Sequence, residues 1–270
     1  MARKRELEEC AICGKQGPLS FEHVPPNKAF NDRRVFKAEL GKHFLSLGAE
    51  EIRMGEISQK GMGEYSLCIK CNNDTGGWYG SHFIGWCYQG MDILVKCKGK
   101  PTLLYLNYLF PLSILKQIIT MFFSVSYGSL RHAHPELVRF VLNKEMKYLN
   151  PKYRIFVYYN IEGRFRWMGN CVRANFQTGT FDQVLELSFP PFGYYMTCNG
   201  AEPPNPSMFE ITYFANFGYK EFSVQTMALP VLPTWSIIPG DYRQKNEYDE
   251  SNKKSRFNVS SVRLKFFAKA

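Results

Sequence analysis

The segment Cys68-Ile69-Lys70-Cys71-Asn72 contains a pair of cysteines two residues apart, and a matching pair occurs in Cys10-Ala11-Ile12-Cys13-Gly14. A tight turn after the first cysteine of such a pair brings both thiolates within reach of one ion, and Gly14 suits the positive φ that this turn often requires. Two pairs can complete a closed tetrahedral shell of four sulfurs, for which zinc is the typical metal. The sequence therefore predicts a zinc site formed by Cys10, Cys13, Cys68 and Cys71.

The predicted zinc site leaves no coordination position for water, so we expect a structural role for it. It would tie together the two ends of the 54-residue insert between the pairs in a segment that has little core of its own. The alternative is two unrelated pairs of buried cysteines. Four further cysteines do not continue the pattern, and we expect buried or unreactive thiols there: Cys87, Cys97, Cys171 and Cys198.

Two further motifs lie beside the cysteine pairs. The segment Ser20-Phe21-Glu22-His23-Val24-Pro25-Pro26 follows the first pair, and Asn72 stands directly after Cys71. With these residues the chain resembles the HNH (ββα-metal, His-Me finger) endonucleases of the branch with a four-cysteine zinc knuckle. In that family an Asp/His/Glu-His-x-x-Pro motif lies on a β-hairpin, and the metal-binding Asn or His begins the helix after the last zinc cysteine. The resemblance covers about residues 8–83.

The residue types at these positions suit phosphodiester hydrolysis. A neutral His23 can accept a proton from the attacking water near physiological pH. Glu22 and Asn72 supply hard oxygen ligands for one Mg²⁺ or Mn²⁺ ion. Because adjacent residues on a strand point to opposite faces, Glu22 and His23 can share a site only if the hairpin is twisted or bulged. The resemblance implies that His23, Glu22 and Asn72 are the catalytic residues and that Glu22 and Asn72 bind magnesium.

The chain departs from the family's pattern between and after the motifs. The usual Asn shortly before the third cysteine is absent, and Gly63-Glu64-Tyr65-Ser66-Leu67 stands there, so the hairpin loop must be held by other contacts. Gly76 occupies the place of the final His, and His82 lies too far along the chain to replace it. Asn73 and Asp74 remain alternative metal ligands.

An excess of basic residues gives the chain a formal net charge of +10, which favours a polyanionic partner such as nucleic acid. Lys28, Arg33 and Arg34 follow the Glu-His motif, and we expect them to contact phosphates of DNA, with RNA as the alternative. Further basic residues extend this charge at Lys37, Lys42, Arg53, Lys60 and Lys70, and in the tail at Lys253, Lys254, Arg256, Arg263 and Lys265. The aromatic residues Trp78, Tyr79 and Trp86 could stack on bases, but we expect packing for at least two of them.

Beyond residue 98 the hydrophobic pattern changes twice. Apolar residues three and four apart after Pro111 predict a buried helix that ends near Gly128, and a second helix is expected from Pro135. The β-branched and aromatic runs at residues 154–159, 184–189 and 209–214 predict an antiparallel sheet. The predicted class is α+β, with a zinc-bound ββα-metal module at 1–98, a helical segment at 99–149, a β-rich domain at 150–245 and a basic tail at 246–270.

The apolar stretch 103–125 raises the alternative of a membrane anchor. We expect a buried helix instead, because four of its residues would be costly at bilayer depth: Asn107, Pro111, Lys116 and Gln117. Residues 1–9 lack the apolar core of a secretory signal. Eight cysteines without such a signal are typical of the reducing cytoplasm, so we expect a cytoplasmic protein without a membrane partner.

Two functions of different classes follow from these observations. The first is a Mg²⁺-dependent DNA endonuclease, with bacterial anti-phage defence as the expected setting and a protein partner bound through residues 99–245. The second is a non-catalytic zinc module that binds nucleic acid or protein. In the second, Glu22 and His23 are incidental and Asn72 merely caps the following helix.

Overall fold

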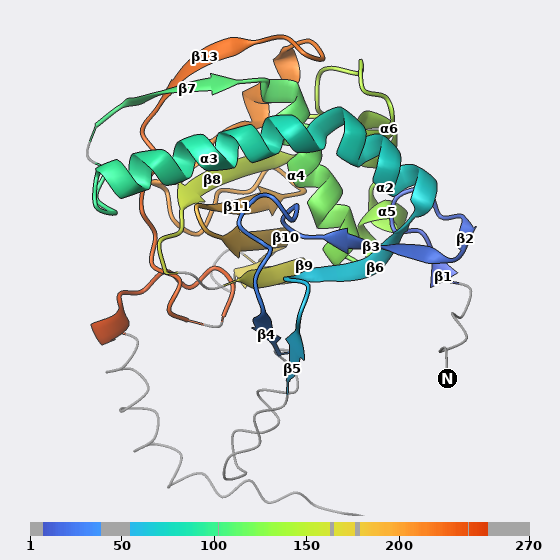
Figure 1. Cartoon of the computed structure of the whole chain (residues 1–270), viewed down its shortest axis with the longest axis horizontal. Coiled ribbons are helices and arrows are strands. Elements are labelled where there is room, and N and C mark those ends of the chain that lie inside the picture. The colour runs from blue at the N-terminus through green and yellow to red at the C-terminus, as the bar shows by residue number, and fades with distance from the viewer. Residues whose placement is uncertain are drawn as a thin grey trace, which may run out of the picture.

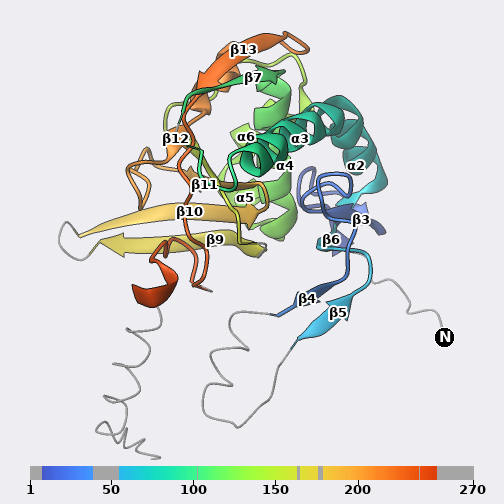
Figure 2. The same ribbon diagram turned by 60° about the vertical axis from the view of Figure 1, so that its left-hand side comes forward.

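The computed structural model describes residues 8–38, 55–101, 103–162, 165–175, 179–236 and 238–247. The described residues form a mixed structure of helices and antiparallel strands, which confirms the general class expected from the sequence. The N-terminal strands lie on one side of a central helix, and a five-stranded sheet lies on the other (Figure 2).

The N-terminal unit is built on two hairpins and the start of a helix. The first cysteine pair lies in the turn between two short strands, β1 (Glu8–Glu9) and β2 (Gln16–Gly17). The second hairpin pairs β3 (Leu19–His23) with β6 (Gly63–Cys68), and the chain passes directly from β6 into α2 (Ile69–Thr75). Between β3 and β6 in the sequence come β4 (Val35–Lys37) and β5 (Glu56–Ser58). These two strands pair with each other and project from the body of the molecule (Figure 1).

Helix α2 continues without a break through the π-helical segment η1 (Gly76–Gly80) into α3 (Ser81–Lys96). Tyr79 and Trp86 on this continuous helix are fully buried, and Trp78 is half-buried against the core. The Trp86 ring stacks on Phe192 of the sheet with ring centroids 4.4 Å apart. These aromatic residues therefore pack in the interior, as expected for at least two of the three.

The central helix is α4 (Pro111–Val125), and all fifteen of its residues are buried. Proline at its first turn suits a helix start, because the missing backbone N–H would have no partner there. The Lys116 ammonium is satisfied inside the protein by the carbonyl oxygens of Asn143 and Lys144, at 2.6 and 3.1 Å. The expected buried helix is confirmed, and within the described residues no helix is long and apolar enough to cross a membrane.

Two short helices follow α4 and lead into the sheet: α5 (Ser129–Ala133) and α6 (Pro135–Leu142). The sheet has the strand order β12-β8-β11-β10-β9, and its neighbours are all antiparallel. Its strands are β8 (Arg154–Tyr159), β9 (Arg166–Asn175), β10 (Thr180–Phe189), β11 (Phe192–Thr197) and β12 (Phe209–Glu210). A separate pair, β7 (Tyr105–Leu109) with β13 (Ser223–Met227), covers α3 at the top of Figure 1.

The expected strand at residues 209–214 is wrong beyond its first two residues. After β12 the chain forms the 3₁₀ helix η2 (Thr212–Asn216). The backbone N–H of Ile155 on the neighbouring strand donates to the Thr212 hydroxyl at 2.9 Å. A side chain therefore takes the place of the next backbone carbonyl, and the ladder ends there.

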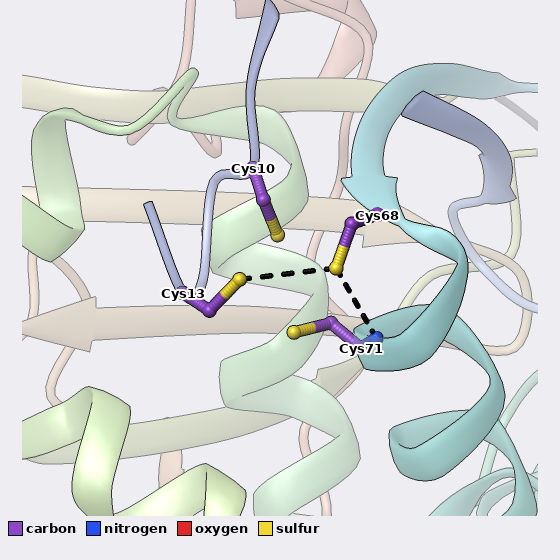
Figure 3. Close-up of side chains that lie close together, drawn as sticks. All are labelled: Cys10, Cys13, Cys68 and Cys71. Atoms are coloured by element: carbon purple, nitrogen blue, oxygen red, sulfur yellow. Dashed lines mark hydrogen bonds between the residues drawn. The ribbon is translucent and has the colours of Figure 1, made fainter. Parts of the chain in front are cut away.

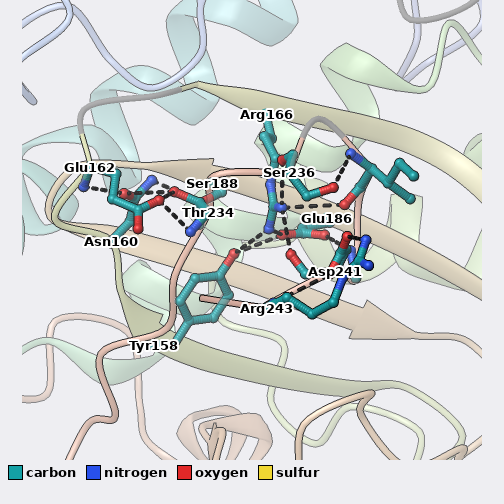
Figure 4. A network of polar contacts seen from close by, with 12 residues as sticks. Tyr158, Asn160, Glu162, Arg166, Glu186, Ser188, Thr234, Ser236, Asp241 and Arg243 are labelled. Carbon is teal, nitrogen blue, oxygen red and sulfur yellow. Dashed lines mark hydrogen bonds and ion pairs between the residues drawn. The ribbon is translucent and has the colours of Figure 1, made fainter. Parts of the chain in front are cut away.

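A buried polar network fastens the segment after β13 to the sheet (Figure 4). Arg166 of β9 forms an ion pair with Glu186 of β10 and donates to the carbonyl oxygens of Ser236 and Asp241, at 3.2 and 3.1 Å. Glu186 also accepts hydrogen bonds from the Tyr158 hydroxyl at 2.7 Å and from a backbone N–H of the same segment. Since every charge has several partners, the network positions this segment without leaving an uncompensated ion.

Most of the buried apolar side chains form one cluster, which extends from Cys10 to Leu229 and includes residues of the N-terminal unit, of α4 and of the sheet. A smaller second cluster contains Phe156, Tyr158 and Leu232. The N-terminal unit therefore packs on α4 and the sheet through a shared core. The division of the chain into domains stays a prediction.

Candidate functional site

The four cysteines of the two pairs converge in space (Figure 3). Their sulfur atoms all lie within 4.8 Å of one another, and the Sγ atoms of Cys13 and Cys68 are 3.8 Å apart. Cys10 and Cys71 are buried, whereas Cys13 and Cys68 are partly exposed. The cluster joins the β1–β2 turn to the junction of β6 and α2, where the Cys68 sulfur accepts the backbone N–H of Cys71.

The thiols of this cluster cannot all ionise together without a cation. The hydrogen bond from Cys71 lowers the pKa of Cys10, and the same contact raises the pKa of Cys71. A divalent cation removes this conflict, because it stabilises each thiolate. Four sulfurs in one closed cluster are the donor set that structural zinc prefers, so the residues fit this metal.

Glu22 and His23 occupy the end of β3, where the β3–β6 ladder is irregular. Ser20 pairs with Leu67 but Phe21 pairs with Tyr65, so Ser66 is an extra residue on β6. Such a bulge increases the local twist of a hairpin. Glu22 and His23 both line one pocket, although they are neighbours on a strand.

The pocket has a volume of about 430 Å³. Its walls come from β3, from the loop at residues 26–28, from one face of the α2–η1–α3 helix and from α4. It brings together Glu22, His23, Asn72 and Lys28, which come from three separate positions along the chain and were all expected to be site residues.

The Glu22 carboxylate is buried, with 8% of the residue exposed. Within the part of the chain that the structure describes, it has no hydrogen-bond or ion-pair partner. Loss of solvation raises its pKa to about 7. A carboxylate in this environment binds either a proton or a cation.

His23 is oriented by the backbone. Its Nε2 atom lies 3.0 Å from the carbonyl oxygen of Lys60, and its ring packs edge-on against Phe21. A carbonyl can only accept, so Nε2 carries the proton and Nδ1 is the acceptor of the neutral ring. Burial lowers the pKa of His23, which favours the neutral form that a general base requires.

Asn72 connects α2 to β3. Its Nδ2 donates to the Ser20 hydroxyl at 3.0 Å and to the Phe21 carbonyl at 3.3 Å. Among the described residues the Oδ1 atom has no hydrogen-bond partner, so this oxygen is available to a cation or a ligand. Asn72 does not cap α2, because Cys68 stands at that position.

The other ligands considered from the sequence do not line the pocket. Asp74 forms an ion pair with Lys70 on the surface of α2, and Asn73 is exposed. His82 stacks on Phe110, with ring centroids 4.1 Å apart.

The expected phosphate-binding residues are all exposed. Lys28 lines the pocket, and Arg33 and Arg34 precede β4. In the described part of the chain none of these three forms an ion pair. Lys37, by contrast, pairs with Glu64. The expected contacts of Lys42 and Arg53 lie outside the described residues, as do those of the basic residues of the 246–270 tail: Lys253, Lys254, Arg256, Arg263 and Lys265.

Two residues of this region were missed by sequence reasoning. Buried Asn31 donates to the Met62 carbonyl at 2.7 Å and accepts the Met62 backbone N–H at 2.7 Å, so it fastens the loop after β3 to the start of β6. The Asn that holds this loop in the HNH family is absent from the chain, so we expected other contacts to hold it. Asn31 provides such contacts. Gln117 of α4 lines the pocket. Gln117 could have been found from the sequence, because it is a polar residue within the apolar run of α4. No sequence signal indicated Asn31.

Comparison of the chain with protein-family models, with curated proteins and with solved structures gives no match.

Proposed function

We propose that this protein is a metal-dependent endonuclease of the HNH type that hydrolyses phosphodiester bonds in DNA. The observation that carries the proposal is the grouping of a buried carboxylate without a partner, Glu22, with His23 and Asn72 around one pocket. The β3–β6–α2 order and the cysteine cluster beside it support the resemblance to this family.

In the proposed site the Glu22 carboxylate and the Asn72 Oδ1 atom hold one Mg²⁺ or Mn²⁺ ion, since both are hard oxygen donors. When bound, the cation supplies positive charge that stabilises the developing charge on the phosphate and leaving oxygen. His23 accepts the proton of the attacking water, and Lys28 holds a phosphate of the substrate at the pocket wall.

The cysteine cluster has a structural part in the proposal. Zinc bound to its four sulfurs would fix the start of α2 against the β1–β2 turn. Asn72, which follows Cys71, is thereby held against β3 beside Glu22.

The experiment is incubation of supercoiled plasmid with the purified protein in Mg²⁺ or in EDTA, beside an RNA substrate. We expect relaxed or linear DNA in Mg²⁺ and intact plasmid in EDTA. Cleavage of the RNA alone would move the substrate to RNA, and no cleavage of either would contradict an endonuclease.

The alternative is a non-catalytic zinc module that binds nucleic acid. One observation favours it: Gly76 stands where the family has its final His, so the cation site has fewer protein ligands. Retarded migration of the plasmid without any cleavage would support this alternative.

A further inference from the structure

Gln117 comes from the centre of α4, outside the N-terminal segment that carries the motifs. It is 1% exposed, yet it lines the same pocket as Glu22 and Asn72. Its Oε1 atom is buried and has no hydrogen-bond partner in the described part of the chain. Leaving such an acceptor unpaired is unfavourable, so a ligand that donates to it would be favoured.

Other buried polar atoms of the described residues also lack a partner, including the Ser113 hydroxyl one turn earlier on α4. Of the side chains with this property, Gln117 is the one that lines the pocket. Lys116, its neighbour, is satisfied by two carbonyl oxygens. Among the described residues, Gln117 therefore combines an unpaired buried oxygen with a place in the pocket wall, and its neighbour Lys116 does not share the unpaired state.

The part of the pocket wall formed by η1 is open. A Cβ atom added at Gly76 or at Gly80 would meet no atom within 4 Å, so the α2–η1 face leaves space in front of Asn72. Mg²⁺ keeps several of its waters when it binds to proteins, and each of these waters is a hydrogen-bond donor.

We propose that the Gln117 amide oxygen accepts a hydrogen bond from the water shell of the divalent cation at Glu22 and Asn72. The inference rests on the proposed function, because it requires a cation at that site. Gln117 is then a positioning residue: it orients the hydrated ion from α4 and satisfies its own buried oxygen. The site would be completed by a helix that lies outside the region of family resemblance.

The test is the affinity of the zinc-containing protein for Mg²⁺ and Mn²⁺, measured by titration calorimetry. Gln117→Leu keeps the approximate shape but removes the amide, and we expect it to weaken the affinity by about 10-fold, the lower end for contacts of this kind. Gln117→Glu keeps an oxygen and adds charge, so its affinity should equal or exceed that of the wild type. Ser113→Ala is the matched control, because it removes an unpaired hydroxyl from the same helix outside the pocket. It should leave the affinity for both ions unchanged.

The outcomes separate this inference from the function on which it rests. Wild-type protein that binds Mg²⁺, together with unchanged affinity in folded Gln117→Leu, would overturn the role of Gln117 and leave the proposed site intact. Wild-type protein that binds neither ion would overturn both. Thermal unfolding of each variant shows whether it is folded. If Gln117→Leu is not folded, Gln117→Glu still tests the inference independently.

Discussion

At the scale of single residues, the Glu22 carboxylate is the most informative group. It lies at the end of β3 and is buried without a partner among the described residues. An unpaired carboxylate in such a place destabilises a fold but suits a cation site, because the cation supplies the missing charge.

We therefore predict that Glu22→Gln stabilises the protein when Mg²⁺ and Mn²⁺ are absent. The pKa of Glu22 is about 7 in the folded protein against 4.5 for an ordinary glutamate. Below pH 4.5 the group is neutral in both states and costs nothing. Between pH 4.5 and 7 the unfolded chain ionises first, so the cost grows, and above pH 7 it reaches roughly 3 kcal/mol.

Urea unfolding of the zinc-containing protein at pH 5 and pH 8 measures this difference. The variant should exceed the wild type in stability at pH 8 and approach it at pH 5. Glu64→Gln, across the same hairpin, is the control, because Glu64 has Lys37 as a partner and its loss should not stabilise. Equal stability of wild type and Glu22→Gln at pH 8 would show that the carboxylate is better solvated than its burial indicates.

At the scale of elements, the junction of β6 and α2 connects the cysteine cluster to the pocket. Cys68 ends the strand, accepts the backbone N–H of Cys71 in the first turn of the helix and belongs to the four-sulfur cluster. One residue thus links zinc binding to the position of the helix on which Asn72 lies.

We predict one zinc ion per chain and a large loss of stability when Cys68 is changed to Ser. Structural zinc contributes about 10 kcal/mol or more of binding free energy to folding, which exceeds the stability of many domains. Elemental analysis and thermal unfolding measure the two effects. Cys171→Ser is the control, since Cys171 is exposed and outside the cluster; a folded, zinc-free Cys68→Ser protein with wild-type stability would refute the site.

The helices and strands also show how much of the structure can be predicted from the sequence. The helices at Pro111 and Pro135 were predicted because proline starts and apolar spacing are local signals. Strand β9 was not predicted, since Gly169, Asn170 and Arg173 interrupt its pattern and it is held by pairing with β10. In the site, the resemblance to the HNH motifs indicated Glu22, His23 and Asn72, whereas Asn31 and Gln117 depend on contacts between distant segments.

At the scale of the whole molecule, α4 lies between the N-terminal unit and the sheet and contacts both (Figure 2). The pocket is therefore a feature of the complete fold, because one of its walls belongs to α4. Lys28 in the pocket wall, and Arg33 and Arg34 before β4, are exposed and form no ion pair in the described part of the chain.

We predict that these three basic residues govern affinity for DNA. Changing all three to Gln should weaken binding and reduce the slope of log affinity against log salt by roughly one per lost phosphate contact. Binding measured over a series of salt concentrations tests this. A variant that neutralises Lys96 at the end of α3, together with Lys98 and Lys100 just after it, removes the same formal charge elsewhere. Equal slopes for the two variants would show that net charge, and not position, determines binding.

The most direct test of the proposed endonuclease is the rate of Mg²⁺-dependent plasmid cleavage by wild-type protein and by His23→Ala under single-turnover conditions. His23 is not a proposed metal ligand, so the variant should keep its fold, its zinc and its Mg²⁺ affinity. Its cleavage should nevertheless be slower by roughly two to four powers of ten, which is the usual contribution of a positioned general base. A folded His23→Ala protein that cuts at the wild-type rate would contradict the assignment of this pocket as the active site.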